Sequence, residues 1–229
     1  MKIGILGTGP VGQAHAARLV GMGHDVMVGT RSPHKTIANK EKDAMGRGSF
    51  GTWYESNRKV KVGTFADCAM HGELLINATL GQHSIEALRS AGSEIDRKIV
   101  IDISNPLDFS KGMPPTLTVC NTDSLGEQIQ KAFPKAKIVK SLNTLSAPLQ
   151  VDPHLMAGGD HHIFVCGNDP EAKQEVISFL KREYGWENIL DLGDIKSSRG
   201  VEMILPLWIN LWGALKTPMF NFKLAMNEK

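Results

Sequence analysis

The chain has 229 residues, of which 41% are hydrophobic and 22% charged, and its formal net charge is +2 at pH 7. A chain of this length can bury one core, with or without a small appended domain. The nearly balanced charge gives no argument for nucleic acid or a membrane surface as a partner, and we expect neither.

An apolar strand and a glycine-rich turn open the chain. Residues 2–6 are mostly apolar, and a GxGxxG turn leads into residues 13–22, which have helical spacing. This order is typical of a dinucleotide-binding site, where the diphosphate lies on the free N–H groups at the start of the helix. The residues of this turn that we expect to bind the cofactor are Gly7, Thr8, Gly9, Pro10, Val11 and Gly12.

The residues after the second expected strand, at 24–29, indicate which nucleotide binds. An NAD site carries Asp or Glu there, to bind the ribose 2′-hydroxyl. This chain instead has Thr30, Arg31 and Ser32, with Lys35 one helical turn further on. Guanidinium, ammonium and hydroxyl groups bind a phosphate that a carboxylate would repel. The pattern therefore predicts NADP.

The region around these residues is basic. Residues 31–61 contain eight Lys or Arg against three Asp or Glu, an excess that suits a phosphorylated ligand. A helix is expected at 33–44. The glycine-rich residues 45–55 are expected to form an ordered excursion on the surface that covers the adenosine end of the site.

Strands and helices then alternate as far as residue 142. Strands are expected at 60–63, 73–79, 98–103 and 137–142, and helices at 65–70, 83–91 and 124–133. Continuously apolar strands are typical of a parallel sheet covered on both faces. The alternation predicts a Rossmann-type, doubly wound α/β fold. The remaining loop, 104–122, is long enough to indicate a function.

A second, smaller α/β pattern follows. It has strands at 163–166 and 189–192, a helix at 170–184 and a last helix from about 198. We expect residues 1–148 to form the NADP-binding domain and residues 149–229 to form a small C-terminal extension on the acceptor side.

The last helix is apolar over residues 201–215, apart from Glu202 and Asn210. This run is shorter than the roughly 20 residues that a membrane span needs. It predicts a long buried helix that also contacts a second subunit through Trp208 or Trp212, and hence a homodimer.

The cysteines indicate the compartment, and the histidines bear on metal binding. Cys68, Cys120 and Cys166 are widely spaced and form no CxxC pattern, so we interpret them as reduced, buried thiols of a cytoplasmic protein. A strand at residue 2 leaves no room for a signal peptide, as expected for that compartment. The eight histidines have no metal-ligand spacing, and no metal site is assigned.

Three turns that follow strands are expected to surround the nicotinamide. They carry hydroxyls, amides and small apolar groups, but no His, Lys or carboxylate that could move an alcohol proton with the hydride. We therefore assign no catalytic side chain and interpret Asp102 as a structural hydrogen-bond partner. Neutral turns favour transfer to an acceptor that handles its own proton, such as a flavin-like ring. The cofactor-binding residues assigned to these turns are Ala78, Thr79, Leu80, Ser104, Asn105, Pro106, Asn143 and Thr144.

Five segments together resemble the NADP oxidoreductases that depend on coenzyme F420. They are 7–12, 28–31, 140–144, 165–169 and 201–207. The resemblance implies an NADP-binding Rossmann domain and hydride exchange between NADP and the deazaflavin F420. It also implies that Thr30, Arg31 and Lys35 hold the 2′-phosphate. This chain has Asn143 where that family commonly has His.

Residues 102–105 and 143–146 are also similar to the nucleotide-binding domain of the six-transmembrane metalloreductases, which implies flavin as another acceptor. Two other functions stay open. One is an NADPH-dependent reductase of a small imine or carbonyl compound, which would need a proton donor. The other is a non-catalytic redox sensor that binds NADP.

Overall fold

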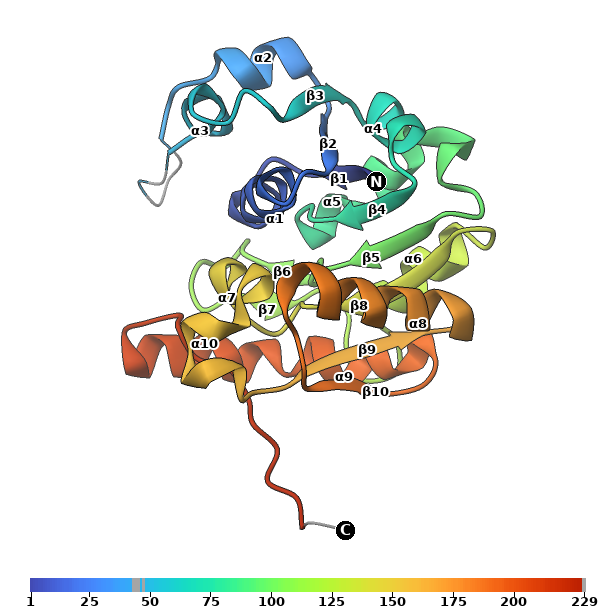
Figure 1. Ribbon diagram of the computed structural model, residues 1–229. Coiled ribbons are helices and arrows are strands. Elements are labelled where there is room, and N and C mark those ends of the chain that lie inside the picture. The colour runs from blue at the N-terminus through green and yellow to red at the C-terminus, as the bar shows by residue number, and fades with distance from the viewer. Residues whose placement is uncertain (43–45, 47, 228–229) are drawn as a thin grey trace.

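The computed structural model describes residues 1–42, 46 and 48–227, and a single large sheet runs through it. The strands of this sheet are β1 (Lys2–Leu6), β2 (Asp25–Thr30), β3 (Lys61–Thr64), β4 (Leu74–Asn77), β5 (Ile99–Asp102), β8 (Lys137–Ser141), β9 (Ile163–Gly167) and β10 (Ile189–Asp191). Their spatial order is β10-β9-β8-β5-β4-β1-β2-β3 (Figure 1).

The sheet is parallel from β3 to β8. The strand order runs outward in both directions from the pair β1 and β4, in which Leu6 lies opposite Asn77. The carboxyl ends of these six strands therefore meet at one edge, next to the turn that follows β1. This arrangement confirms the predicted doubly wound α/β fold, in which ligands bind at that edge.

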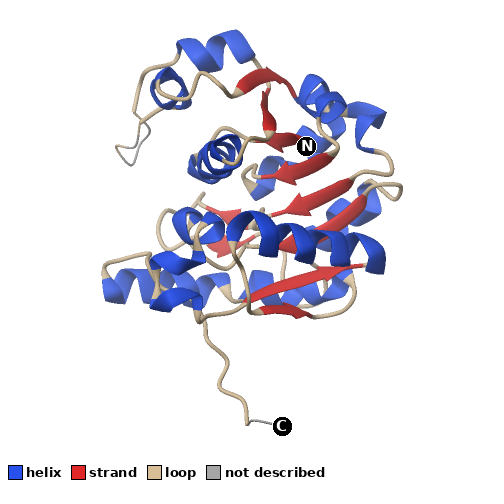
Figure 2. Cartoon of the chain, viewed as in Figure 1, coloured by secondary structure: helices blue, strands red, loops and turns tan. Residues whose placement is uncertain are grey.

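Helices cover both faces of the sheet (Figure 2). The α-helices are α1 (Pro10–Gly21), α2 (Pro33–Ala38), α3 (Phe50–Glu55), α4 (Phe65–His71), α5 (Gly81–Ser90), α6 (Leu125–Ala132), α7 (Ala147–Val151), α8 (Pro170–Phe179), α9 (Ser198–Met203) and α10 (Leu205–Leu215). Short 3₁₀ turns span Gly92–Ile95, Pro153–Leu155, Ala157–Gly159 and Ile195–Ser197, and a π-turn, Leu180–Tyr184, extends α8.

Alternate residues of each strand supply two cores. Leu74 and Ile76 of β4 pack into the core under α1, α7 and α8, whereas Leu75 packs into the core under α4, α5 and α6. Successive side chains of a strand point to opposite faces, so an apolar strand supplies both. The continuous apolar runs of the sequence therefore mark buried central strands.

The basic segment is less helical than expected. The helix predicted at 33–44 ends at Ala38, because the next residue, Asn39, has extended backbone angles. Residues 43 and 44 of that prediction, and residues 45 and 47 of the predicted excursion, lie outside the described residues. Part of the predicted excursion is also helical: Ser49 accepts from the N–H of Thr52 and caps α3, which buries Phe50 against the core.

The long loop 104–122 contains a small antiparallel pair of strands, β6 (Leu107–Asp108) and β7 (Thr116–Leu117). Cys120 follows β7 and is exposed, so its predicted burial is wrong. Cys120 lies in a surface connection and belongs to neither core, although the preceding residue, Val119, packs against the core under α4, α5 and α6. Cys68 and Cys166 are buried, as predicted.

The C-terminal residues do not form a separate sheet. Strand β9 pairs antiparallel with β8, and β10 pairs parallel with β9, so both extend the main sheet. Residues 3–186 contribute to one continuous core that includes α8. The division at residue 148 remains a prediction about function.

The last helix differs most from expectation. The run 201–215 is divided between α9 and α10, and Pro206 lies in the first turn of α10. Only Leu205 and Ile209 of α10 are buried, so the prediction of one long buried helix is wrong: a single side of α10 faces the body. Within the described residues, no helix has the length and apolar character that crossing a membrane requires.

Candidate nucleotide-binding site

The turn between β1 and α1 needs glycine at its first and third positions for two different reasons. Gly7 has a φ of 118°, which side chains of L residues rarely tolerate. A Cβ on Gly12 would lie 2.2 Å from the carbonyl oxygen of Gly7, so only glycine lets α1 pack this closely on the turn. Both features are typical of a dinucleotide-binding turn, in which the first glycine allows the bend and the third allows the helix to pack closely.

Gly9 lies between them and faces open space. A Cβ built on it would meet no heavy atom within 4 Å. Gly9 is also the N-cap of α1, and no side chain caps this helix. Exposed N–H groups at a helix start, with no side chain in front of them, form an anion-binding site. The geometry fits a diphosphate.

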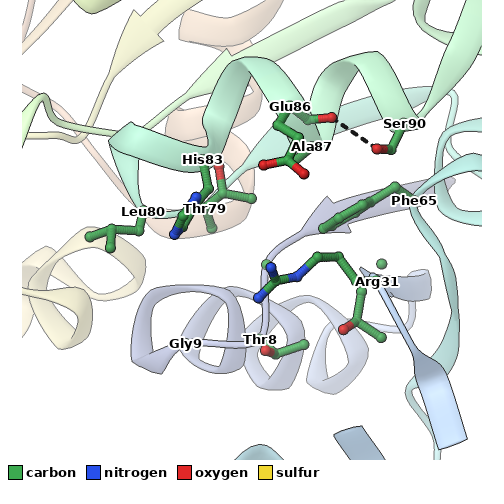
Figure 3. Close-up of a pocket in the computed structure, with 14 residues that line it drawn as sticks. Thr8, Gly9, Arg31, Phe65, Thr79, Leu80, His83, Glu86, Ala87 and Ser90 are labelled. Atoms are coloured by element: carbon green, nitrogen blue, oxygen red, sulfur yellow. Dashed lines mark hydrogen bonds between the residues drawn. The ribbon is translucent and has the colours of Figure 1, made fainter. Parts of the chain in front are cut away.

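A hollow of about 240 Å³ opens beside this turn, at the carboxyl edge of the sheet. It brings together residues from three separate turns, and one of them, at 78–80, belongs to the three turns expected around the nicotinamide. Those assigned residues are Gly7, Thr8, Gly9, Thr30, Arg31, Ala78, Thr79 and Leu80. Figure 3 shows Arg31 extending into the hollow between the glycine turn and α5.

The other wall of the hollow was not identified from the sequence. It consists of Phe65 on α4 and a stripe along α5. The stripe residues are His83, Glu86, Ala87 and Ser90. Their spacing, i, i+3, i+4 and i+7, places them on one helix face. A helix that starts at a cofactor-binding turn presents one face to the ligand. The spacing of these four residues after the turn at 78–80 could therefore have predicted them from the sequence.

A second hollow, of about 490 Å³, shares Thr8 and Gly9 with the first. Lys35 lines this hollow, whereas Arg31 lines the first, so the two predicted phosphate ligands flank the glycine turn from different sides. Ser49 and Phe50 also line the second hollow. The described part of the 45–55 excursion therefore lies beside Lys35 and not over the hollow of Arg31.

The residues after β2 differ in what they offer a ligand. Arg31 and Lys35 are exposed, and Ser32 is half-buried at the start of α2. Thr30 is buried, and its hydroxyl lies 2.9 Å from that of Thr36. The Thr30 side chain thus ties β2 to α2, and the charge for a phosphate comes from Arg31 and Lys35.

The turns after β5 and β8 contact each other directly. The side chain of Asn143 donates to that of Asn105 over 2.9 Å, and Asn105 donates back to the Asn143 carbonyl over 2.8 Å. Ser104, Pro106, Asn143 and Thr144 are buried, and neither these four nor Asn105 lines the two hollows. Their assignment as cofactor-binding residues remains a prediction.

A buried ion cluster lies under these turns. Lys140 contacts Asp102 over 2.8 Å and Glu202 over 2.9 Å, and all three side chains are almost fully buried. Burial opposes the charge of Lys140, but attraction by Asp102 and Glu202 outweighs it and raises the pKa of this ammonium well above its usual range.

The cluster joins α6 and α9 to the sheet. Glu202 of α9 accepts from the N–H groups of Leu125 and Gly126 at the start of α6. Asp102 accepts from Ser104 and Asn77, and this confirms its expected structural role. The role of Glu202 was not predicted, since the sequence shows only a polar residue in an apolar run.

Together, the sheet order, the glycine turn and the basic residues after β2 define a Rossmann-type dinucleotide-binding protein. A family model described as "NADP oxidoreductase coenzyme F420-dependent" matches residues 2–106. The F420-dependent NADP reductase of Methanocaldococcus jannaschii is 31% identical over 216 residues, which are 92% of each protein. The chain therefore belongs to the family of F420-dependent NADP oxidoreductases, and it is an NADP-dependent oxidoreductase.

Two further relatives bear on the function. A crystal structure from Arthrobacter sp. FB24, provisionally assigned as an F420-dependent NADP reductase, is 53% identical, has a TM-score of 0.93 and covers 99% of this chain. The metalloreductase STEAP3 of Rattus norvegicus is 31% identical over 212 residues, but this chain spans only 38% of its length. A reductive aminase from Aspergillus terreus, 16% identical with a TM-score of 0.61, shares the fold alone.

Proposed function

We propose that this protein transfers a hydride between NADP(H) and a deazaflavin of the coenzyme F420 type, or a flavin. The observation that carries this proposal is the neutral pair of turns after β5 and β8, where Asn105 and Asn143 bond to each other. A dehydrogenase that makes an alcohol needs a proton donor at this place. A deazaflavin or flavin ring accepts a hydride at one atom and exchanges its proton with water.

In this proposal, the nucleotide is bound along the carboxyl edge of the sheet. The N–H groups at the start of α1 bind the diphosphate beside Gly9, and the hollow lined by Arg31 and α5 takes the adenosine. Arg31 and Lys35 bind the 2′-phosphate from two sides, with Thr30 and Ser32 shaping the backbone between them. The nicotinamide then lies towards the turns after β5 and β8.

In this proposal, the protein's main contribution to the reaction is to position the two rings. The acceptor supplies the redox-active ring when it is bound. The turns hold the two rings in contact and exclude water from between them, which is sufficient for direct transfer between stacked rings. No side chain of the protein needs to change its protonation state.

The names of the relatives support the acceptor class. F420 occurs in the names of the M. jannaschii reductase and the Arthrobacter structure, and the latter resembles this chain along its whole length. The metalloreductase relatives are much longer proteins, and this chain matches only part of their length. They support the nucleotide-binding half of the proposal, and flavin remains the second acceptor.

Stopped-flow mixing of the NADPH-loaded protein with F420, FMN and FAD in turn tests the proposal. We expect NADPH absorbance to decay with one of them at a rate that saturates with acceptor concentration. Oxidation of NADPH by a cyclic imine or a ketone, with none by the three ring acceptors, would instead identify an imine or carbonyl reductase. Tight NADPH binding without oxidation by any of them would identify a sensor.

The pH dependence is a second prediction. Because the turns carry no titratable donor, the hydride-transfer rate should change less than about threefold between pH 5.5 and 7.5. A steep loss centred near the pKa of a histidine, abolished by changing His83 in the hollow to Asn, would contradict direct transfer. The pH series is therefore measured on the wild type and on His83→Asn, and the two series are compared.

A further inference from the structure

Leu142, the first residue after β8, has an unusual backbone. Its φ is 58°, in the left-handed region that disfavours residues with a Cβ. Four other non-glycine residues of the described chain have positive φ, namely Arg97, Asn121, Ala157 and Lys216, and all four are exposed. Leu142 is buried, with 2% of its surface accessible. Such a conformation persists only where the surroundings enforce it.

The side chain of Gln150, on α7, enforces this conformation. Its Nε2 atom donates to the carbonyl oxygens of Leu142, over 2.9 Å, and Leu145, over 3.1 Å. These two carbonyls bracket Asn143 and Thr144. Gln150 is 2% exposed, so no water competes for the two bonds. The amide thus clamps both ends of the turn.

The orientation of the Gln150 amide is fixed in turn by His15 of α1. Both N–H groups of Gln150 are used on carbonyls, so its Oε1 faces Nε2 of His15, 3.0 Å away, and must accept. Nε2 of His15 therefore carries the proton. Burial lowers the pKa of His15 to about 4, so the ring is neutral and Nδ1 is an acceptor.

The remaining partner is Tyr184, at the end of the π-turn. Its hydroxyl lies 2.6 Å from Nδ1 of His15 and can only donate to it. The bonds form a chain with a single direction: Tyr184 O–H to His15, His15 N–H to Gln150, and Gln150 N–H to the two turn carbonyls. Every member is buried, and a reversed Gln150 amide would set its oxygen against two carbonyl oxygens.

The clamped turn carries Asn143, whose side chain donates to Asn105 and to the carbonyl of Val201 on α9. We propose that Gln150, oriented by His15 and Tyr184, is a positioning residue for hydride transfer, because it holds Leu142 in the left-handed backbone that fixes the turn of Asn143 and Thr144 beside the proposed acceptor site. The same chain of bonds ties this turn to α1, whose first turn faces the nucleotide. This inference rests on the proposed function for the place of the acceptor.

The kinetic test uses Gln150→Met, which keeps the length of the side chain and removes its polar atoms. Without the clamp, the left-handed backbone of Leu142 becomes a minor state, so hydride transfer should slow about tenfold while NADPH affinity stays within twofold. Adding Leu142→Gly should restore most of the rate, because glycine adopts positive φ readily.

This rescue separates positioning from packing. Leu142→Gly removes a buried side chain, so it should worsen a variant whose only defect is loose packing. A Gln150→Met protein with the wild-type rate, or a double variant slower than Gln150→Met, would overturn the proposal. If Gln150→Met does not fold, Tyr184→Phe replaces it, with a smaller expected loss of two- to fivefold. Tyr54→Phe changes the only other tyrosine of the sequence and is the control, and its hydride-transfer rate should equal that of the wild type.

Nitrogen-15 NMR of the histidine rings tests the network without any acceptor. His15 should show a protonated Nε2 and an unprotonated Nδ1 at pH 7, and the signal is assigned by its loss in His15→Gln. Protonation at Nδ1 would overturn the inference. If the wild type reduces neither deazaflavin nor flavin, the proposed function fails. The NMR result still decides whether the hydrogen-bond chain exists as described.

Discussion

Arg31 is the residue that we propose selects NADP over NAD in this fold. The residue leaves β2 at the carboxyl edge of the sheet and lines the hollow beside the glycine turn, at the place where an NAD site carries a carboxylate. Thr30, next to it, was predicted to bind the phosphate as well, but its hydroxyl is paired with Thr36. We therefore propose that Arg31 and Lys35 supply the contact energy for the 2′-phosphate.

We predict that Arg31→Ala weakens NADPH binding ten- to a hundredfold and leaves NADH binding almost unchanged. One charge-assisted contact with phosphate contributes about 1.5–3 kcal/mol, which corresponds to this loss. Fluorescence titration of both nucleotides measures it. Arg58→Ala removes the same charge from the basic segment, at a side chain that lies over Tyr54, and serves as the control. An equal loss for NADH and NADPH in Arg31→Ala would contradict the assignment.

At the scale of elements, α1 combines two tasks. Its first turn carries the N–H groups that we propose bind the diphosphate, and further along His15 contacts Gln150 of α7 and Tyr184 at the end of the π-turn. The helix is fixed at its start by the close approach of Gly12 to Gly7. The same element thus links the binding turn to the clamp on the acceptor-side turn.

The two glycines at the start of α1 should respond differently to the same substitution. Gly12→Ala places a Cβ against the carbonyl of Gly7, and we expect the free energy of unfolding to fall by about 1–3 kcal/mol. Gly9 has a φ of −72° and open space around it, so Gly9→Ala should keep its stability within about 0.5 kcal/mol but lose NADPH affinity.

Urea unfolding and nucleotide titration of both variants check this difference. Each variant is the control for the other, since both add one methyl group to the same turn. A Gly9→Ala protein that binds NADPH as tightly as the wild type would mean that the diphosphate does not approach this residue.

Protonation of His15 should make stability depend on pH. The pKa of His15 falls from 6.5 in the unfolded chain to about 4 in the folded protein, because burial disfavours the charged ring. The neutral ring therefore contributes its full stability above pH 6.5, and about 3 kcal/mol is lost as the pH falls from 6.5 to 4.

The measurement is the free energy of unfolding of the wild type and of His15→Gln across this pH range. The other histidines and the carboxylates titrate in both proteins, so the difference between the two curves isolates His15. We expect the wild type to fall more steeply between pH 6.5 and 4. Parallel curves would show that His15 is not buried in its neutral form.

At the scale of the whole molecule, α10 and the residues after it leave apolar surface uncovered. Leu207 and Leu215 of α10 are 51% and 53% exposed, and Trp208 and Trp212 are half-buried. Nε1 of Trp208 has no hydrogen-bond partner within the described part of the chain. Figure 1 shows the described end of the chain, up to residue 227, extending away from the body below α10. An apolar surface of this kind is typical of a protein interface.

We predict a homodimer with two-fold symmetry that uses this surface. Light scattering at micromolar concentration should give twice the mass of the 25.0 kDa chain, and Trp212→Glu should give the monomer. Met70→Glu changes an exposed methionine of α4 and should leave the dimer intact. A monomeric wild type would mean that α10 serves the monomer alone, and the assembly prediction would then be wrong.

Much of the fold and of the site could be predicted from local patterns. Apolar runs such as 98–103 predicted the central strands, because a strand buried on both faces needs apolar residues at every position. The spacing of Gly7, Gly9 and Gly12 predicted a diphosphate site, and Arg31 and Lys35 indicated NADP. Each of these signals depends on residues that are close together in the sequence. The family could be inferred from the same segments.

Only the tertiary structure decided how distant residues meet. It extended the main sheet with β9 and β10, buried only two residues of α10, and placed Arg31 and Lys35 on different sides of the glycine turn. It also joined Glu202 to Lys140 and His15 to Gln150, pairs that are 62 and 135 positions apart in the sequence. A sequence pattern shows periodicity and local chemistry. Burial and hydrogen-bond partners depend on which surfaces the whole chain brings into contact.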